Sequence, residues 1–136
     1  MQSAETALCD AGPLVALFDP RDAEHVRCRA ALDAFDGRLL TTWPVLTEVS
    51  HFLSGVQQPR LWDFVMMGGV LVVDLLSKDV ARLRALTAKY ADLPMDLADA
   101  SLVIIAERLR VQMIFTLDAH FHAYRLHGNR SFHVVP

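Results

Sequence analysis

Four acidic residues are spaced along the sequence so that each lies in or just after an apolar segment. They are Asp10, Glu48, Asp99 and Asp118, in the segments TALCDAG, TWPVLTEVSHFL, PMDLADASLVIIA and MIFTLDAHF. If these segments form strand ends and helix starts of a parallel α/β sheet, the carboxylates meet in a crevice outside the carboxyl ends of the strands. Carboxylates crowded in this way repel one another unless they hold cations, and Mg²⁺ or Mn²⁺ are natural occupants because they prefer oxygen ligands. The chemistry predicted is hydrolysis of a phosphate ester.

Each acid taken singly also has an ordinary structural interpretation. Asp96 and Asp99 lie three residues apart at the start of a predicted helix, where a carboxylate stabilises the helix dipole. Glu48 is harder to explain, because Val45 and Phe52 bracket it at helical spacing and no basic residue nearby in the sequence offers a partner. The set of four, rather than any one member, therefore favours a site.

Composition indicates one compact domain spanning residues 1–136. The chain has 136 residues, of which 53% are hydrophobic and 21% charged, enough for one core and too few for two ordinary domains. The formal charge of -3 argues against a protein that coats nucleic acid through bulk charge. Binding of nucleic acid would need a local basic patch. Lysine occurs only at Lys78 and Lys89, and arginine, the remaining basic residue type, is the better bidentate phosphate ligand.

Cysteine usage and hydropathy predict a cytoplasmic protein. Cys9 and Cys28 form no CxxC pattern, so we expect two reduced thiols. The first ten residues, MQSAETALCD, lack the basic and apolar regions of a signal peptide. The most apolar windows, GGVLVVDLL and ASLVIIA, are far shorter than the roughly 18 to 20 residues of a membrane-spanning helix.

The hydrophobic pattern predicts alternating strands and helices. We expect strands at ALCD, RLLTT, VLVVDLL, VQMIFTLD and SFHVVP, with VLVVDLL buried on both faces of the sheet. We expect helices at PLVALFD, residues 21–36, PVLTEVSHFLSG, PRLWDFVMM, residues 78–90 and LPMDLADASLVIIAERL. Ser77 is expected to cap the helix at 78–90, and Val45, Val49, Phe52 and Leu53 to form one buried helix face. This order predicts a three-layer α/β/α sandwich with a mostly parallel central sheet.

Four segments, in order over the whole chain, resemble a PIN domain and are most similar to VapC-type ribonuclease toxins. They are LCDAGPLVALFD, PVLTEVSHFL, DLADASLVIIAERL and IFTLDAHF, of which the strand ending in Thr-x-Asp before Phe is the most specific. The resemblance implies a metal-dependent endoribonuclease that hydrolyses RNA phosphodiester bonds, as the toxin of a type II toxin-antitoxin pair. It implies that one or two Mg²⁺ or Mn²⁺ ions are held by Asp10, Glu48, Asp99 and Asp118, with Asp96 at the rim acting through water or on a second ion. Thr116 matches the family's hydroxyl beside the last aspartate.

The chain departs from the family pattern after Asp10. Many members carry Ser or Thr there, whereas Ala11, Gly12 and Pro13 follow in this sequence. The missing hydroxyl bears on how waters in the metal pocket are oriented. The backbone N–H of Gly12 is an alternative donor.

The segment 43–67 is rich in aromatic residues and methionine. Core burial is expected for about half of its large members, which are Trp43, Phe52, Trp62, Phe64, Met66 and Met67. The rest fit a partner surface, since interfaces use the same residue types. In the family this region packs against an antitoxin or a second subunit, so we expect a homodimer that binds a small antitoxin. His120 and His122 follow Asp118 and are within reach of a phosphate, although alternating histidines in a loop favour a surface role.

Three other interpretations compete with the toxin, and the sequence argues against the first of them. A response-regulator receiver is an α/β domain of similar size, but it needs a lysine near its last core strand, and no lysine follows Lys89. A catalytically silent PIN-like module that binds RNA or protein would keep the fold without the activity. A housekeeping RNA-processing nuclease would keep the activity without an antitoxin.

Overall fold

The computed structural model of the chain describes residues 5–136. Residues 1–4, part of the segment in which no signal peptide is expected, lie outside the described residues. A five-stranded sheet with strand order β3-β2-β1-β4-β7 runs through the middle of the molecule, and all its pairs are parallel. Its strands are β1 (Glu5–Cys9), β2 (Gly37–Thr41), β3 (Leu71–Val72), β4 (Met113–Phe115) and β7 (His133–Val135).

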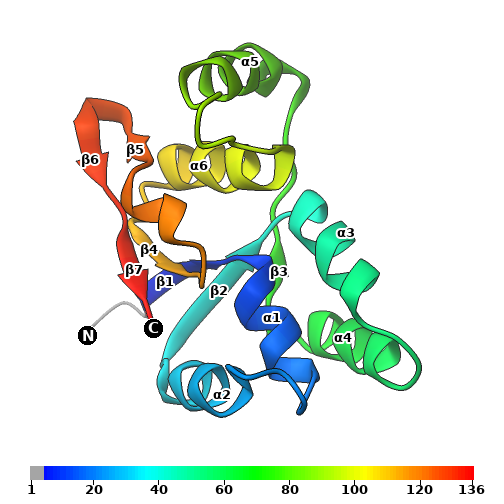
Figure 1. Cartoon of the computed structure of the whole chain (residues 1–136). Helices are drawn as coiled ribbons and strands as arrows, with labels where there is room; N and C mark the ends of the chain where they lie inside the picture. Colours follow the sequence, from blue (N-terminus) through cyan, green and yellow to red (C-terminus); the bar gives the residue numbers. More distant parts are fainter. Residues whose placement is uncertain (1–4) are drawn as a thin grey trace.

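Helices cover both faces of this sheet. They are α1 (Ala11–Phe18), α2 (His25–Ala34), α3 (Trp43–Phe52), α4 (Gln57–Met66), α5 (Val80–Lys89) and α6 (Leu97–Leu109). Helices α5 and α6 lie on one side, α1, α2 and α4 lie on the other, and α3 contacts both α1 and α6 (Figure 1). The predicted three-layer α/β/α sandwich with a parallel central sheet is therefore confirmed.

The chain between β4 and β7 adds short elements that the hydrophobic pattern does not predict. They are the 3₁₀ turns η2 (Ala119–His122) and η3 (His127–Asn129) and an antiparallel hairpin of β5 (Arg125–Leu126) and β6 (Arg130–Ser131). The segment SFHVVP thus contributes to two strands. Among the helices of residues 5–136, none has the length and hydropathy that a membrane crossing requires.

The core is centred on β1 and α6. Residues 7–9 of β1 are fully buried, and α6 is buried without interruption over residues 98–106. A helix inside the molecule is apolar on all sides, which accounts for the continuous run ASLVIIA. Both free cysteines, Cys9 and Cys28, are buried.

The segment VLVVDLL is not a strand buried on both faces, contrary to expectation. Only Leu71 and Val72 join the sheet, as the short edge strand β3, and 42% of the Leu71 surface is exposed. An edge strand has one pairing neighbour, and the chain leaves β2 after these two residues. The predicted Ser77 cap is also wrong, because Ser77 begins the 3₁₀ turn η1 (Ser77–Asp79) and Asp79 precedes α5.

One residue of the predicted buried face of α3 is exposed. Val45, Val49 and Leu53 are buried, but Phe52 is 68% exposed. Phe52 follows Glu48 by four residues, so the two share a helix face, and both line the same surface cleft. Trp43, Trp62, Met66 and Met67 are exposed as well, so fewer of the large residues in 43–67 enter the core than expected.

Candidate metal centre

Two parallel strands bring the first and last acids of the sequence pattern together. Asp10 directly follows β1, and Asp118 follows β4 by three residues. Strands β1 and β4 pair with Cys9 opposite Phe115, so both end at the same edge of the sheet. The backbone N–H of Asp10 donates a 2.9 Å hydrogen bond to the carbonyl of Phe115, which holds the segments that follow β1 and β4 next to each other.

Thr116 links these two acids through one hydroxyl. Its Oγ1 donates to Oδ2 of Asp10 at 2.8 Å and accepts the backbone N–H of Asp118 at 3.0 Å. The other oxygen of Asp10 accepts the N–H of Ala11 at 2.8 Å, because Asp10 is the N-cap of α1. Both Asp10 carboxylate oxygens are thus oriented by buried donors.

The start of α6 delivers Asp99. Asp96 is the N-cap, and its Oδ1 accepts the N–H of Asp99 at 2.8 Å, while Asp99 Oδ2 accepts the N–H of Asp96 at 3.2 Å. This reciprocal capping box fixes both side chains and begins the helix at Leu97. The helix is therefore shorter at its start than the predicted segment from Leu93.

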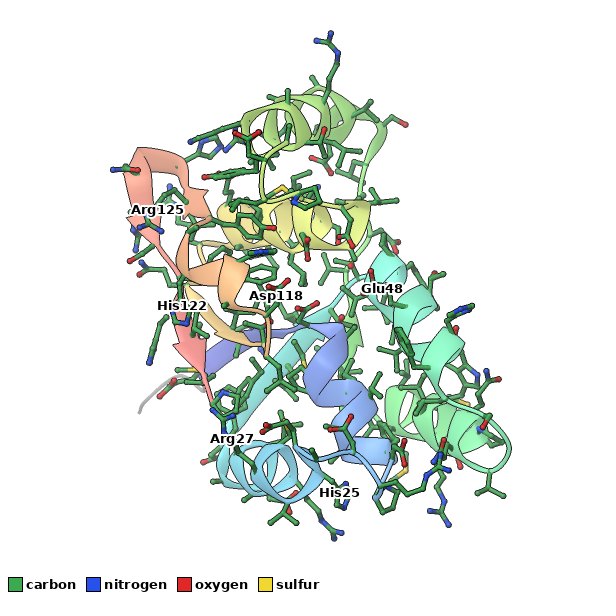
Figure 2. The ribbon with its side chains drawn as sticks, viewed as in Figure 1. His25, Arg27, Glu48, Asp118, His122 and Arg125 are labelled. Atoms are coloured by element: carbon green, nitrogen blue, oxygen red, sulfur yellow. The ribbon has the colours of Figure 1, made fainter. Side chains whose placement is uncertain are left out.

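Helix α3 brings Glu48 to the same edge. A 2.6 Å hydrogen bond between the hydroxyls of Thr42, before α3, and Ser101, in α6, fixes the two helices to each other. Glu48 consequently lies across the cleft from the strand ends, and Figure 2 shows it on the opposite side of Asp118 from His122.

Three of the predicted acids form a compact group. Asp10, Asp99 and Asp118 each place one carboxylate oxygen within 4.8 Å of the others. Glu48 and Asp96 lie outside this group but line the same cleft, which has a volume of about 550 Å³. The structure thus brings all five residues to one cleft, and their role as metal ligands stays a prediction.

The electrostatics of the cleft are those of uncompensated carboxylates. Burial, followed by the neighbouring charge of Asp96, raises the pKa of Asp99 to about 7. Burial and a hydrogen bond with Asp96 raise the pKa of Glu48 to about 7. Burial also raises the pKa of Asp10, against the opposing hydrogen bonds from Thr116 and Ala11. Among the described residues, no lysine or arginine lines the cleft to offset this charge.

This donor set fits a hard divalent cation. The converging atoms are carboxylate oxygens, the ligands that Mg²⁺ and Mn²⁺ prefer. Buried carboxylates without a basic partner are costly, and a bound cation removes that cost. The donor set is less suited to zinc, because no cysteine or histidine belongs to the group of three.

Histidines 120 and 122 differ in their surroundings. His120 lines the cleft, with Nδ1 3.4 Å from Oδ1 of Asp118, and its backbone N–H donates to that oxygen at 2.9 Å. His122 lines a separate, smaller pocket on the far side of Asp118.

Sequence reasoning missed three supporting residues. Tyr124 is fully buried, and its hydroxyl donates to Oδ2 of Asp99 at 3.3 Å. Thr42 and Ser101 make the hydroxyl contact between α3 and α6. A buried tyrosine in a segment without regular structure needs an acceptor, but the sequence does not show which acid it reaches.

No protein-family model matches the chain. A curated relative, Ribonuclease VapC26 of Mycobacterium tuberculosis, is 27% identical over 134 residues, which cover 95% of this chain and 99% of that protein. The crystal structure of VapC20 of M. tuberculosis, described as a toxin that cleaves the sarcin-ricin loop, superposes with a TM-score of 0.78 at 15% identity, covering 86% of this chain and 93% of that one. VapBC2 of Rickettsia felis, solved with a DNA fragment from its promoter, gives a TM-score of 0.64 at 10% identity, covering 95% and 98%.

Proposed function

We propose that this chain, a PIN domain of the VapC type, is a metal-dependent endoribonuclease that hydrolyses RNA phosphodiester bonds as the toxin of a toxin-antitoxin pair. The observation that carries the proposal is the group of Asp10, Asp99 and Asp118 in a cleft that, within residues 5–136, no lysine or arginine lines. The similarity to a ribonuclease over nearly the full length of both chains supports the same activity. On this proposal residues 1–136 form a single cytoplasmic nuclease domain.

The residues of the cleft have distinct parts in the proposed chemistry. Asp10, Asp99 and Asp118 would hold Mg²⁺ or Mn²⁺, with Glu48 and Asp96 completing the acidic surround. When bound, the ion would neutralise charge on the phosphodiester and lower the pKa of an attacking water. Thr116 orients Asp10, and Tyr124 orients Asp99, through the hydrogen bonds already described. These donors keep the carboxylate oxygens turned into the cleft.

The test is RNA cleavage with controlled metal content. Purified protein should cleave a panel of structured RNAs with Mg²⁺ or Mn²⁺, lose activity in EDTA and regain it with excess metal. An Asp118→Asn protein purified in parallel controls for contaminating nucleases, which would cleave in both preparations. Equal cleavage in EDTA, or none with either metal, would overturn the proposal and favour a silent binding module.

An antitoxin partner and a homodimer belong to the same proposal. Exposed apolar side chains gather on α3, on α4 and directly after α4, namely Phe52 (68%), Trp62 (37%), Met66 (77%) and Met67 (86%). Such surface is costly in water and typical of partner-binding sites. The similar structure VapBC2 of Rickettsia felis is solved bound to a DNA fragment from its promoter, which supports a DNA-binding partner. Expression of this chain alone should therefore be toxic, and a small DNA-binding protein encoded next to it should relieve the toxicity.

Two measurements distinguish a toxin with an antitoxin partner from a housekeeping RNA-processing nuclease. Light scattering should give the mass of two chains, and co-expression with the neighbouring small protein should yield a stable complex. Harmless overproduction of a monomer that recruits no partner, together with metal-dependent cleavage, would favour a housekeeping RNA-processing nuclease.

A further inference from the structure

The carboxylate of Asp118 stands between two hollows of the surface. One is the cleft that Asp10, Asp99 and Asp118 line, called the metal cleft below. The other is a pocket of about 210 Å³ that shares Leu117 and Asp118 with it. The second pocket is lined by Arg27 of α2 and His122 of η2, together with Glu24, the carboxylate that pairs with Arg27, and Thr116 lies in its wall. A strand of RNA crossing the metal cleft over Asp118 would enter this pocket next.

Arg27 is held in place by two hydrogen bonds that leave other guanidinium N–H groups without a partner in the described residues. Its Nη1 donates to Glu24 Oε2 at 3.1 Å and its Nη2 to the carbonyl of Pro136 at 3.2 Å. A guanidinium carries five N–H donors in a planar fork, so three remain. The side chain is 57% exposed, which leaves them open to a ligand.

His122 is held through its backbone by a second arginine. Arg125 Nη1 donates to the carbonyl of His122 at 2.7 Å and to that of Tyr124 at 3.0 Å. Figure 2 shows Arg27, His122 and Arg125 on one side of Asp118, with Glu48 on the other. The exposed imidazole of His122 can donate a hydrogen bond in either charge state.

The groove on the Glu48 side of the cleft offers a phosphate no cationic side chain among the described residues. This groove, of about 390 Å³, shares Glu48 and Asp96 with the metal cleft and is otherwise mostly apolar, with Trp43 and Leu97 in its wall. Among the described residues lining this groove there is no arginine, lysine or histidine. A polyanion gains from cations along its path, because each phosphate contact releases a counterion. Within residues 5–136, the pocket beyond Asp118 therefore offers a guanidinium and an imidazole to a phosphate, and the groove beside Glu48 offers neither.

We propose that the pocket beyond Asp118 is a subsite for the RNA backbone phosphate next to the scissile one, with Arg27 and His122 as its hydrogen-bond donors. Arg125 is a positioning residue, because it holds the backbone of η2 and not the phosphate. This subsite deepens the proposed nuclease function and rests on it. It also gives a chain with a net charge of -3 a local means of binding a polyanion.

The test compares Arg27→Gln and His122→Gln with Arg29→Gln. Arg29 lies on the same helix and makes an exposed ion pair with Asp33 at 3.7 Å, but it does not line the pocket, so its replacement changes net charge equally. Binding of a labelled 20-nucleotide single-stranded RNA would be followed by fluorescence anisotropy with Ca²⁺ present, at several salt concentrations. Hydrolysis of bis(p-nitrophenyl) phosphate with Mn²⁺ would report on the metal cleft alone.

Arg27→Gln and His122→Gln should each weaken RNA binding about threefold to tenfold, and Arg27→Gln should lower the salt slope by about 0.7, the value for one contact to a single strand. Hydrolysis of the small ester, which has no neighbouring phosphate to place in the subsite, should fall less than RNA binding does in both variants, and Arg29→Gln should leave it unchanged. Equal behaviour of Arg27→Gln, His122→Gln and Arg29→Gln would overturn the subsite, as would a wild type that binds no RNA. If Arg27→Gln has a lower melting temperature than the wild type, the RNA affinity of His122→Gln tests the subsite instead. If the wild-type protein binds RNA through Arg27 but hydrolyses neither substrate, the phosphate-binding site is supported and the proposed nuclease activity is contradicted.

Discussion

Thr116 Oγ1 donates a 2.8 Å hydrogen bond to Oδ2 of Asp10, although 106 positions of sequence separate the two residues. The same hydroxyl accepts the N–H of Asp118, so one side chain orients two predicted metal ligands. Thr116→Val keeps the volume and should lower metal affinity and cleavage about 10- to 100-fold. Thr41→Val is the matched control, because its buried hydroxyl donates only to the carbonyl of Cys9. Calorimetric metal titration and cleavage rates that fall equally in both variants would contradict the assignment.

Asp99 and Asp96 should respond differently to loss of charge. Asp99 belongs to the group of three converging carboxylates, whereas Asp96 is exposed at the cleft edge. Asp99→Asn should abolish metal binding and cleavage as fully as Asp10→Asn or Asp118→Asn. Asp96→Asn should cost about 10- to 100-fold, as outer residues of metal sites do. Asparagine also caps helices, so α6 should keep its start in that variant. An inactive Asp96→Asn beside a nearly normal Asp99→Asn would reverse the two roles.

The stability of the metal-free protein should fall as pH rises from about 4 to about 7. Burial raises the pKa of Asp99 and of Glu48 to about 7 in the folded chain, above the unfolded value near 4. Between these values the folded state binds more protons than the unfolded state, so raising the pH favours unfolding. In EDTA, the melting temperature should be lower at pH 8 than at pH 5 by about 3–6 °C.

Two controls identify the groups responsible for that pH dependence. Asp99→Asn should make the profile in EDTA less steep, because the amide does not titrate, and the pH dependence that remains is that of Glu48. Mg²⁺ added at pH 8 should restore the melting temperature of the wild type but not that of Asp99→Asn. A wild-type profile that rises from pH 5 to pH 8 would show that other groups dominate.

Tyr124→Phe should weaken metal binding without unfolding the protein. The change removes the hydroxyl that donates to Asp99 Oδ2 and keeps the ring packed between Tyr90 and Phe121. Tyr90→Phe is the matched control, because that hydroxyl accepts the N–H of Arg125 and touches no acid of the cleft. We expect a loss of cleavage in Tyr124→Phe about tenfold larger than in Tyr90→Phe. Similar losses would mean that the tyrosines act through packing alone.

The layers of the fold and the meeting of the acids could be predicted from the sequence because they follow from periodicity. A strand followed by Asp-Ala-Gly-Pro and a strand followed by Thr-Leu-Asp both end at the carboxyl edge of a parallel sheet, wherever the helices pack. Glu48 could be placed because its helical neighbours Val45 and Val49 must face the core. These inferences use only local pattern and the geometry of parallel strands.

What could not be predicted depends on contacts between distant segments. VLVVDLL has the composition of a central strand, but its place at the sheet edge is decided by the strand order β3-β2-β1-β4-β7. Tyr124 reaches Asp99 from a segment without regular periodicity. Phe52 has the polarity of a core residue, but it stands on the cleft side of α3. In each case tertiary packing overrides local preference.

The capping box of Asp96 and Asp99 at the start of α6 would couple the first turn of this helix to binding of a cation by Asp99. The backbone N–H of Asp99 is bonded to Asp96, and the carboxylate of Asp99 is turned both to the backbone of Asp96 and toward Asp10 and Asp118. Repulsion between these carboxylates therefore acts directly on the first turn of the helix, and a bound cation would remove it. Local opening of this turn should be frequent without metal and rare with it. The amide protons of Asp99 and Ala100 should then exchange with solvent more slowly when Mg²⁺ is added, which makes the first turn of α6 a reporter of whether the proposed metal site is occupied.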